Sequence, residues 1–191
     1  MQLQLPRDLG DMVFSFSFWV PPTTWEEMDS KKKEKVTKRS CLFAHARERV
    51  GTVMGRGRLY PPAKNAAEQA NIRMCFEEKT LALDIQQHFP WTRGKIGIMV
   101  IGVDEIPLTG YWEGKPHTKK PDCSNMLKQA EDALNANPKT GFIGSWLDDC
   151  WVAPLYCDKI YGPYPGVQIT LFLFQNLLIQ KPATPRKRRL P

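Results

Sequence analysis

The chain has 191 residues and a formal net charge of +7 at pH 7, and 42% of its residues are hydrophobic. This length is enough for one domain with a sizeable core, and the basic excess makes nucleic acid the first partner to consider, ahead of a membrane surface. Five cysteines without a CxxC pair argue against a disulfide scaffold. The apolar runs are shorter than the roughly 20 residues of a membrane helix, so we expect an intracellular protein.

The first predicted element is a strand that a pair of prolines ends. In MVFSFSFWV, residues 12–20, large apolar side chains recur at every second position, which is typical of a strand with one buried face. Pro21 and Pro22 end it because proline cannot donate to a ladder. Residues 26–40 carry dense charge and no sustained apolar stripe. We expect a solvated helix or mobile arm there, with a surface facing nucleic acid as the alternative.

The middle of the chain predicts a hairpin, a helix and a strand. Residues 51–62, GTVMGRGRLYPP, are glycine-rich and basic but lack the spacing of a nucleotide-binding loop, so they indicate a loop or hairpin. The apolar spacing of residues 63–87 predicts a helix, which Pro61 and Pro62 open. Residues 95–103, KIGIMVIGV, are largely apolar and predict a central strand.

The last part of the chain predicts one more helix and two strands. Residues 104–121 form a loop that ends in lysines, and a helix follows at 122–136. Strands are expected at 151–159 and 167–174. Helices and strands mix without a regular βαβ order, which favours an α+β fold. We therefore expect one domain over residues 1–180, with a basic arm within 23–58, and a disordered basic tail at 181–191.

The helix predicted at 122–136 has two distinct faces. At about 100° per residue, its apolar side chains gather on one face and its polar ones on the other. In the simplest interpretation Asp122 is an N-cap and the polar face contacts only water. The packing face holds Met126, Ala130, Ala133 and Leu134, and the polar face holds Asp122, Asn125, Lys128 and Asp132.

A second acidic pair suggests another interpretation. Asp148 and Asp149 lie in WLDDCWV, at the start of the next predicted strand. If the loop before them doubles back to the beginning of the helix, Asp122 and Asp149 could share a divalent ion. Carboxylate oxygens suit Mg²⁺, and nearby lysines would then hold a phosphate. This arrangement is typical of metal-dependent phosphodiester cleavage.

The segment from PDCSNMLKQAEDALN through GFIGSWLDDCWV resembles the RusA family of Holliday-junction resolvases. The family pattern is D-x-D-N-x-x-K on a helix, then a DD pair led by tryptophan or isoleucine, and a lysine ten residues later. Residues 119–174 align with it, and the first strand with its proline pair resembles the family's first strand. The matching positions are Asp122, Asn125, Lys128, Asp132, Asp148, Asp149 and Lys159.

This resemblance implies a mixed sheet with flanking helices and a Mg²⁺-dependent endonuclease, with Mn²⁺ as a substitute, that resolves four-way DNA junctions by paired nicks. It also implies a homodimer, because two symmetric incisions need two sites related by a two-fold axis. Small phage-encoded resolvases have this size, so we expect a phage origin and a place in the cytoplasm of a bacterium or phage-infected host. The implied metal ligands are Asp122, Asp149 and Asp148, the implied catalytic residues are Asp122, Asp149 and Lys128, and the implied DNA contacts are Lys119, Lys120, Asn125 and Lys159.

One position departs from the family pattern. The second aspartate of the helix motif is Ser124 here, and a neutral hydroxyl is a poor metal ligand beside a carboxylate. Either Asp148 supplies the missing carboxylate or Asp132 reaches the metal through water. The main alternative is a protein of the same fold that binds branched DNA without cleaving it. A further one is a basic structural or RNA-binding protein in which the acids are only caps.

Overall fold

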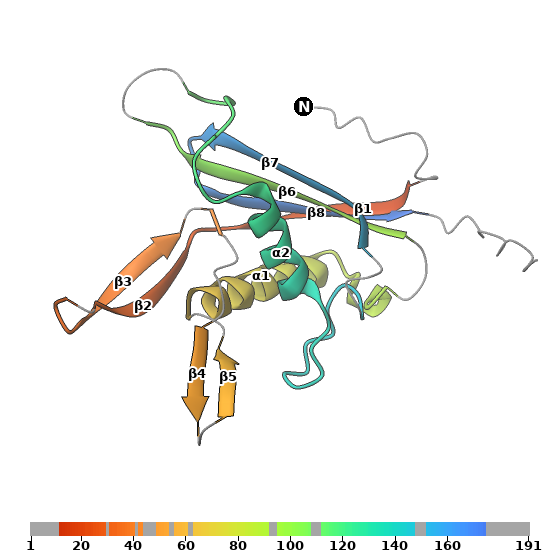
Figure 1. Cartoon of the computed structure of the whole chain (residues 1–191). Coiled ribbons are helices and arrows are strands. Elements are labelled where there is room, and N and C mark those ends of the chain that lie inside the picture. Colours follow the sequence, from red (N-terminus) through yellow and green to blue (C-terminus); the bar gives the residue numbers. More distant parts are fainter. Residues whose placement is uncertain are drawn as a thin grey trace, which may run out of the picture.

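The computed structural model describes residues 12–29, 31–40, 42–43, 49–53, 56–60, 63–91, 95–107, 112–147 and 152–174. Within these ranges, four strands form one mixed sheet in the order β1-β8-β6-β7 (Figure 1). Strand β8 pairs antiparallel with both β1 and β6, whereas β6 and β7 run parallel. The strands are β1 (Met12–Val20), β6 (Lys95–Glu105), β7 (Val152–Gly162) and β8 (Gly166–Phe174).

Helices α1 (Ala63–Ala82) and α2 (Cys123–Leu134) pack against each other and against the sheet (Figure 1). Helix α1 contacts β1, and α2 contacts β6 and β7. A short 3₁₀ helix, η2 (Gln86–His88), follows α1. Parallel strands need a long crossover, and α2 supplies it between β6 and β7. The mixed sheet with packed helices confirms the predicted α+β class. The start of α2 lies near the end of β6, because residues of both line one pocket.

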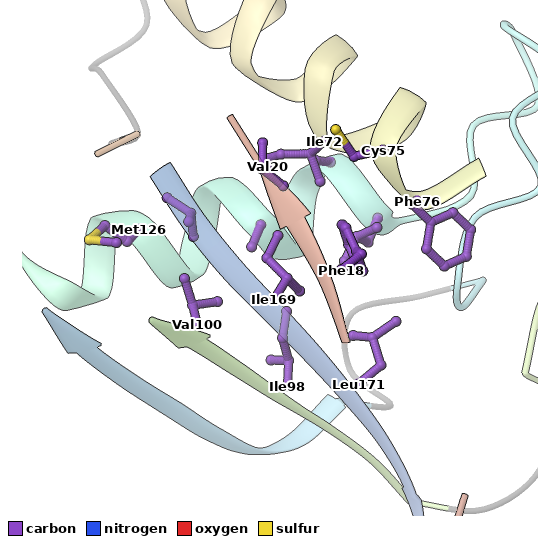
Figure 2. Close-up of a cluster of buried hydrophobic side chains, with 14 of the residues drawn as sticks. Phe18, Val20, Ile72, Cys75, Phe76, Ile98, Val100, Met126, Ile169 and Leu171 are labelled. Atoms are coloured by element: carbon purple, nitrogen blue, oxygen red, sulfur yellow. The ribbon is translucent and has the colours of Figure 1, made fainter. Parts of the chain in front are cut away.

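The core lies between the helices and the sheet, where alternate strand residues point toward the helices (Figure 2). Phe18 and Val20 of β1, Ile98 and Val100 of β6, and Ile169 and Leu171 of β8 are buried there. The apolar face predicted for α2 is confirmed, because its four apolar residues have no exposed surface. These residues are Met126, Ala130, Ala133 and Leu134.

Gly102 allows α2 to lie close to the second half of β6. A Cβ atom at this position would lie 2.4 Å from Met126 Cε and 2.7 Å from Leu42 Cδ2, far inside van der Waals contact. A larger side chain on this face of β6 would force the ends of the Met126 and Leu42 side chains to move. The glycine therefore leaves the space that the Met126 and Leu42 side chains fill between α2 and β6.

Two β-hairpins stand apart from the main sheet. Strands β2 (Thr23–Asp29) and β3 (Glu34–Ser40) pair antiparallel along their whole length. The solvated helix predicted as one form of residues 26–40 is therefore wrong, whereas the predicted mobile arm stays a prediction. A two-stranded ribbon exposes most of both faces, so its strands lack the apolar alternation that marks a strand of a buried sheet. Strands β4 (Arg49–Val53) and β5 (Arg56–Tyr60) form the hairpin expected from the glycine-rich basic stretch.

The remaining predicted boundaries differ from the structure by a few residues. The helix expected at 63–87 ends at Ala82, and the strand expected at 95–103 continues to Glu105 between two neighbours of the sheet. The basic tail lies outside the described residues. Across the ranges that the structure describes, no helix is long and apolar enough to cross a membrane.

Candidate functional site

A groove with a volume of about 480 Å³ opens where the end of β6 meets the start of α2 and the base of the β2–β3 hairpin. We call it the β6–α2 groove. It holds two carboxylates, those of Asp104 and Asp122, although these residues lie 18 positions apart in the sequence. Its full lining is Arg39, Ser40, Leu42, Lys64, Asp104, Lys120, Pro121, Asp122 and Asn125.

Asp104 reaches the groove because of the two-residue period of β6. Successive side chains of a strand alternate between faces, so Asp104 shares the helix-facing side of the strand with Ile98 and Val100. These two residues are buried in the core, whereas Asp104 lies beyond it, next to the start of α2. The sequence prediction missed Asp104 because it ended the strand at Val103. The continued alternation up to residue 104 was the signal that could have found it.

The buried side chain of His117 contacts the carboxylate of Asp104. Its Nε2 lies 2.9 Å from Asp104 Oδ2, and the backbone N–H of Glu105 donates to Asp104 Oδ1 at 2.9 Å. The imidazole is 3% exposed and packs edge-on against the ring of Tyr161. Both carboxylate oxygens of Asp104 therefore have a donor, and its rotamer is fixed.

The protonation state of His117 follows from its burial. Desolvation lowers the pKa of His117, and the positive charges of Lys159 and Lys119 lower it further, while Asp104 opposes both effects. The imidazole is therefore neutral at pH 7, and it donates to Asp104 from Nε2. Its Nδ1 then carries no proton and can only accept a hydrogen bond. Within the described residues this buried atom has no hydrogen-bond partner.

Asp122 occupies the N-cap position of α2 without acting as a side-chain cap. Its backbone is extended (φ −74°, ψ 149°), and among the described residues its carboxylate makes no capping hydrogen bond. The backbone carbonyl of Asp122 instead accepts from the N–H groups of Asn125 and Met126. The prediction that Asp122 is the N-cap residue is therefore confirmed for its position, although its side chain does not cap the helix. Its exposed carboxylate faces the groove at the positive end of the helix dipole.

Lys159 has an internal role that the sequence did not predict. It lies on β7 opposite Gly102, and its Nζ donates to the carbonyls of Lys119 at 2.6 Å and Pro121 at 2.7 Å. Two of the three ammonium donors thus hold the segment that leads into Asp122. The predicted DNA contact by Lys159 stays a prediction, whereas Lys120 lines the groove directly.

Lys128 and Asp132 pair with each other farther along α2. Lys128 Nζ lies 2.7 Å from Asp132 Oδ1. At 1.5 Å per residue, they lie roughly 9 and 15 Å beyond Asp122 along the helix axis, and neither lines the groove. Asp132 is too distant to reach a metal at Asp122 through one water, so that hypothesis for the missing carboxylate is not supported. Ser124 is exposed in the first turn.

Asp148 and Asp149 lie outside the described residues, so their assignment as metal ligands stays a prediction. The described residues on either side are informative. The loop before them turns back at the C-terminal end of α2, where Ala136 donates to the carbonyl of Trp146. After them, Val152 pairs with Ile96, at the opposite end of β6 from Asp104. These contacts do not provide the return to the beginning of α2 that the shared-ion hypothesis requires.

Cations surround the two carboxylates of the groove. Lys64 comes from the first turn of α1, with Nζ 3.6 Å from Oε1 of the buried Glu68 and 5.5 Å from the ring centroid of Trp25. Arg39 from the hairpin and Lys120 from the loop before α2 complete the set. A phosphate that enters the groove thus meets positive charge from three separate segments.

The oxygen donors of the groove fit a hard divalent cation. Asp104 and Asp122 offer carboxylates, and Asn125 offers an amide oxygen. In the described part of the chain, no group of three His, Cys, Asp or Glu side chains is close enough to hold a metal. Mg²⁺ commonly binds through one or two carboxylates and completes its shell with water and substrate phosphate. The described residues are therefore compatible with Mg²⁺ and would hold it weakly without a substrate.

A family model described as endodeoxyribonuclease RusA matches residues 42–172, well over half of the chain. The match covers β6, α2 and β7, and with them Asp104, Asp122 and Asn125 of the groove. It begins after the β2–β3 hairpin. No curated protein matches the chain.

Proposed function

Since this chain belongs to the family of RusA endodeoxyribonucleases, we propose that the β6–α2 groove cleaves the phosphodiester backbone of four-way DNA junctions. One observation carries the proposal, namely that Asp104 and Asp122 line a groove that also holds Arg39, Lys64 and Lys120. Carboxylates alone would repel DNA phosphate. Carboxylates that bind a cation, within a ring of basic side chains, provide the charge pattern of metal-dependent phosphodiester cleavage.

In this proposal Asp104 and Asp122 hold Mg²⁺, for which Mn²⁺ can substitute. When bound, the ion supplies Lewis-acid polarisation of the phosphate and a water of lowered pKa. His117 keeps the carboxylate of Asp104 in one orientation, and Lys159 fixes the approach to Asp122. Lys64 and Lys120 contact phosphate oxygens and compensate charge near the scissile bond.

A second candidate function is binding of branched DNA without cleavage. It is favoured by Ser124, which stands where the family pattern has an aspartate, and by the presence of only two carboxylates in the groove as described. A protein with too few metal ligands would still bind DNA through the basic groove, but it would not cleave the phosphodiester backbone. The two candidate functions predict the same binding and different products.

A labelled four-way junction, incubated with the protein with and without Mg²⁺ or Mn²⁺, separates the two candidates. We expect Mg²⁺-dependent nicks, and we expect Asp104→Asn and Asp122→Asn to slow cleavage by at least about 100-fold, which needs only about 2.7 kcal/mol. Both variants should bind the junction at least as tightly as wild type, because each loses a negative charge facing phosphate. Asp132→Asn is the matched control, since Asp132 lies outside the groove and pairs with Lys128.

Two results would change the assignment. Wild-type rates in both groove variants would place the active site elsewhere. Junction binding without any cleavage, in either metal, would replace the nuclease with the binding protein. We further propose a homodimer, because paired incisions in a two-fold symmetric junction need two groove sites related by a two-fold axis.

A further inference from the structure

The β2–β3 hairpin is firmly attached beside the groove, although the family match does not include it. Helix α1 holds its base, where Asn71 Nδ2 donates to the carbonyl of Pro21 and to Thr23 Oγ1, both at 3.0 Å. On the other strand, Ser40 Oγ donates to the carbonyl of Leu42 at 2.7 Å. Arg39 and Ser40, at the end of β3, line the groove itself. The hairpin therefore begins at the groove and projects away from the body of the protein (Figure 1).

The tip of the hairpin has a defined turn. Asp29 Oδ1 accepts the backbone N–H groups of Lys31 at 2.9 Å and Lys32 at 3.3 Å. The N–H of Lys33 donates to the carbonyl of Asp29 at 2.8 Å, and Lys33 adopts a left-handed backbone with φ 55°. The side chain of Asp29 thus turns the chain and is occupied by backbone donors. Three consecutive lysines are left exposed at the end of the ribbon.

The positive charge of the three lysines at the tip of the hairpin is available to a partner. Lys35 pairs with Glu26 at 3.1 Å across the strands. Within the described residues, by contrast, no acidic side chain forms an ion pair with Lys31, Lys32 or Lys33. The hairpin has little apolar surface to offer, because among its described residues Met28, at 59% exposure, is the one large apolar side chain that is exposed. A protein partner would need an apolar centre for its interface, whereas a phosphate backbone needs only cations.

We propose that the β2–β3 hairpin binds the phosphate backbone of the duplex arm next to the cleavage site, with its lysine tip as the distal contact. This inference rests on the proposed function, which places a DNA junction in the β6–α2 groove. Strand β2 has seven residues, which span roughly 23 Å at about 3.3 Å each. That length equals about seven base pairs of a duplex at 3.4 Å per step. The hairpin thus extends the DNA footprint about two thirds of a helical turn beyond the groove.

The test compares Lys31→Gln/Lys32→Gln with the matched control Lys79→Gln/Lys139→Gln, which removes two lysines that belong neither to the hairpin nor to the lining of the groove. Lys33 is left unchanged so that the left-handed turn is preserved. Junction affinity is measured without divalent metal over a range of salt concentrations. Each lost phosphate contact lowers the log–log salt slope by about 0.9, so we expect a drop of about 1.8 for the hairpin variant and no change for the control.

In a second junction all four arms are shortened to about 5 base pairs and closed by loops, so that each duplex ends before the lysine tip of the hairpin, which reaches about seven base pairs. Wild type and the control should bind this second junction more weakly than the full junction, and Lys31→Gln/Lys32→Gln should bind both equally. An unchanged slope and a retained arm-length effect in the hairpin variant would overturn the inference.

Cleavage is scored separately with Mg²⁺, so that the two proposals can fail independently. Cleavage by wild type with no contribution from the hairpin lysines leaves the proposed function standing and removes the hairpin inference. Binding that depends on the hairpin lysines, without cleavage in Mg²⁺, supports the hairpin inference and removes the proposed nuclease function. If wild type does not bind the junction at all, both proposals are wrong.

Discussion

At the scale of single residues, the groove differs from the family pattern by one charge. Ser124 is exposed in the first turn of α2, two residues after Asp122, where the family pattern has a carboxylate. A carboxylate there would add a negative charge and a hard oxygen close to the groove, and a hydroxyl adds neither. Asp104 offers a carboxylate from a different element, and its oxygens are already held by His117 and the N–H of Glu105.

Ser124→Asp therefore tests whether a missing ligand limits the site. We expect the variant to raise the rate of Mg²⁺-dependent junction cleavage at least tenfold, which requires only about 1.4 kcal/mol of additional transition-state stabilisation. It should also lower the Mg²⁺ concentration needed for half-maximal rate. Cleavage rates across a Mg²⁺ titration measure both effects, with Ser124→Asn as the control that adds volume without charge.

The opposite outcome is equally informative. If Asp148 already supplies the third carboxylate, Ser124→Asp should leave the rate unchanged or reduce it. Asp148→Asn should then be as damaging as Asp149→Asn. The four variants are assayed side by side on one junction substrate.

The two groove carboxylates also show how far the sequence could identify the site. Asp122 could be predicted because the D-x-x-N-x-x-K spacing places it at the start of a helix beside Asn125. The alternation along β6 could have placed Asp104 at the end of that strand, but it could not assign Asp104 to the site of Asp122, because only the fold brings the end of β6 to the start of α2. The polar character of Lys128 and Asp132 was correctly predicted, and the rise of the predicted helix already places them roughly 9 and 15 Å beyond Asp122.

At the scale of elements, the position of α2 depends on a few polar contacts at its start. The side chain of Lys159 donates to two carbonyls in the segment before Asp122. The backbone carbonyl of Lys159 in turn accepts a hydrogen bond from the backbone N–H of His117. The strands and α2 could be predicted because their apolar spacing is strong and one face of each is buried. The β2–β3 hairpin could not, because each of its cross-strand pairs contains at least one polar side chain, so neither face of the ribbon is continuously apolar.

Lys159→Met separates a positioning role from a DNA contact. Loss of two charge-assisted hydrogen bonds should lower the free energy of unfolding by about 1–3 kcal/mol, as measured by urea denaturation. The cleavage rate should fall because Asp122 is less well placed, while the salt slope of junction binding stays the same. Lys139→Met is the control for removal of an exposed lysine. A shallower salt slope at unchanged stability would show that Lys159 contacts phosphate.

The attachment of the β2–β3 hairpin can be weakened in the same way. Asn71→Ala removes the donor that joins α1 to Pro21 and Thr23, so we expect faster hydrogen exchange in β2 and β3 and a loss of about 1 kcal/mol of stability. Exchange in β6 and β8 should not change, because these strands lie in the main sheet. Equal acceleration in all four strands would mean that the hairpin is part of the global unfolding unit.

At the scale of the whole molecule, the proposed reaction sets a requirement that one groove cannot meet. A four-way junction is resolved when two strands of like polarity are cut at symmetric positions. One chain offers a single β6–α2 groove among its described residues, so a second copy related by a two-fold axis has to supply the other. The net charge of +7 per chain would double on the same DNA, which strengthens association at low salt.

A cruciform extruded from a supercoiled plasmid tests this requirement. A single nick relaxes the plasmid, and the cruciform is then reabsorbed before an independent second cut can occur. A dimer with two active grooves should instead make both cuts in one binding event and release linear DNA. We therefore expect linear product with little nicked circle, and a mass by light scattering of twice that of the chain.

In mixtures with excess Asp122→Asn, mixed dimers carry one inactive groove, so nicked circles should replace linear DNA as the main product. Nicked circles from the wild type alone, together with the mass of a single chain, would contradict the dimer and leave each groove to cut independently.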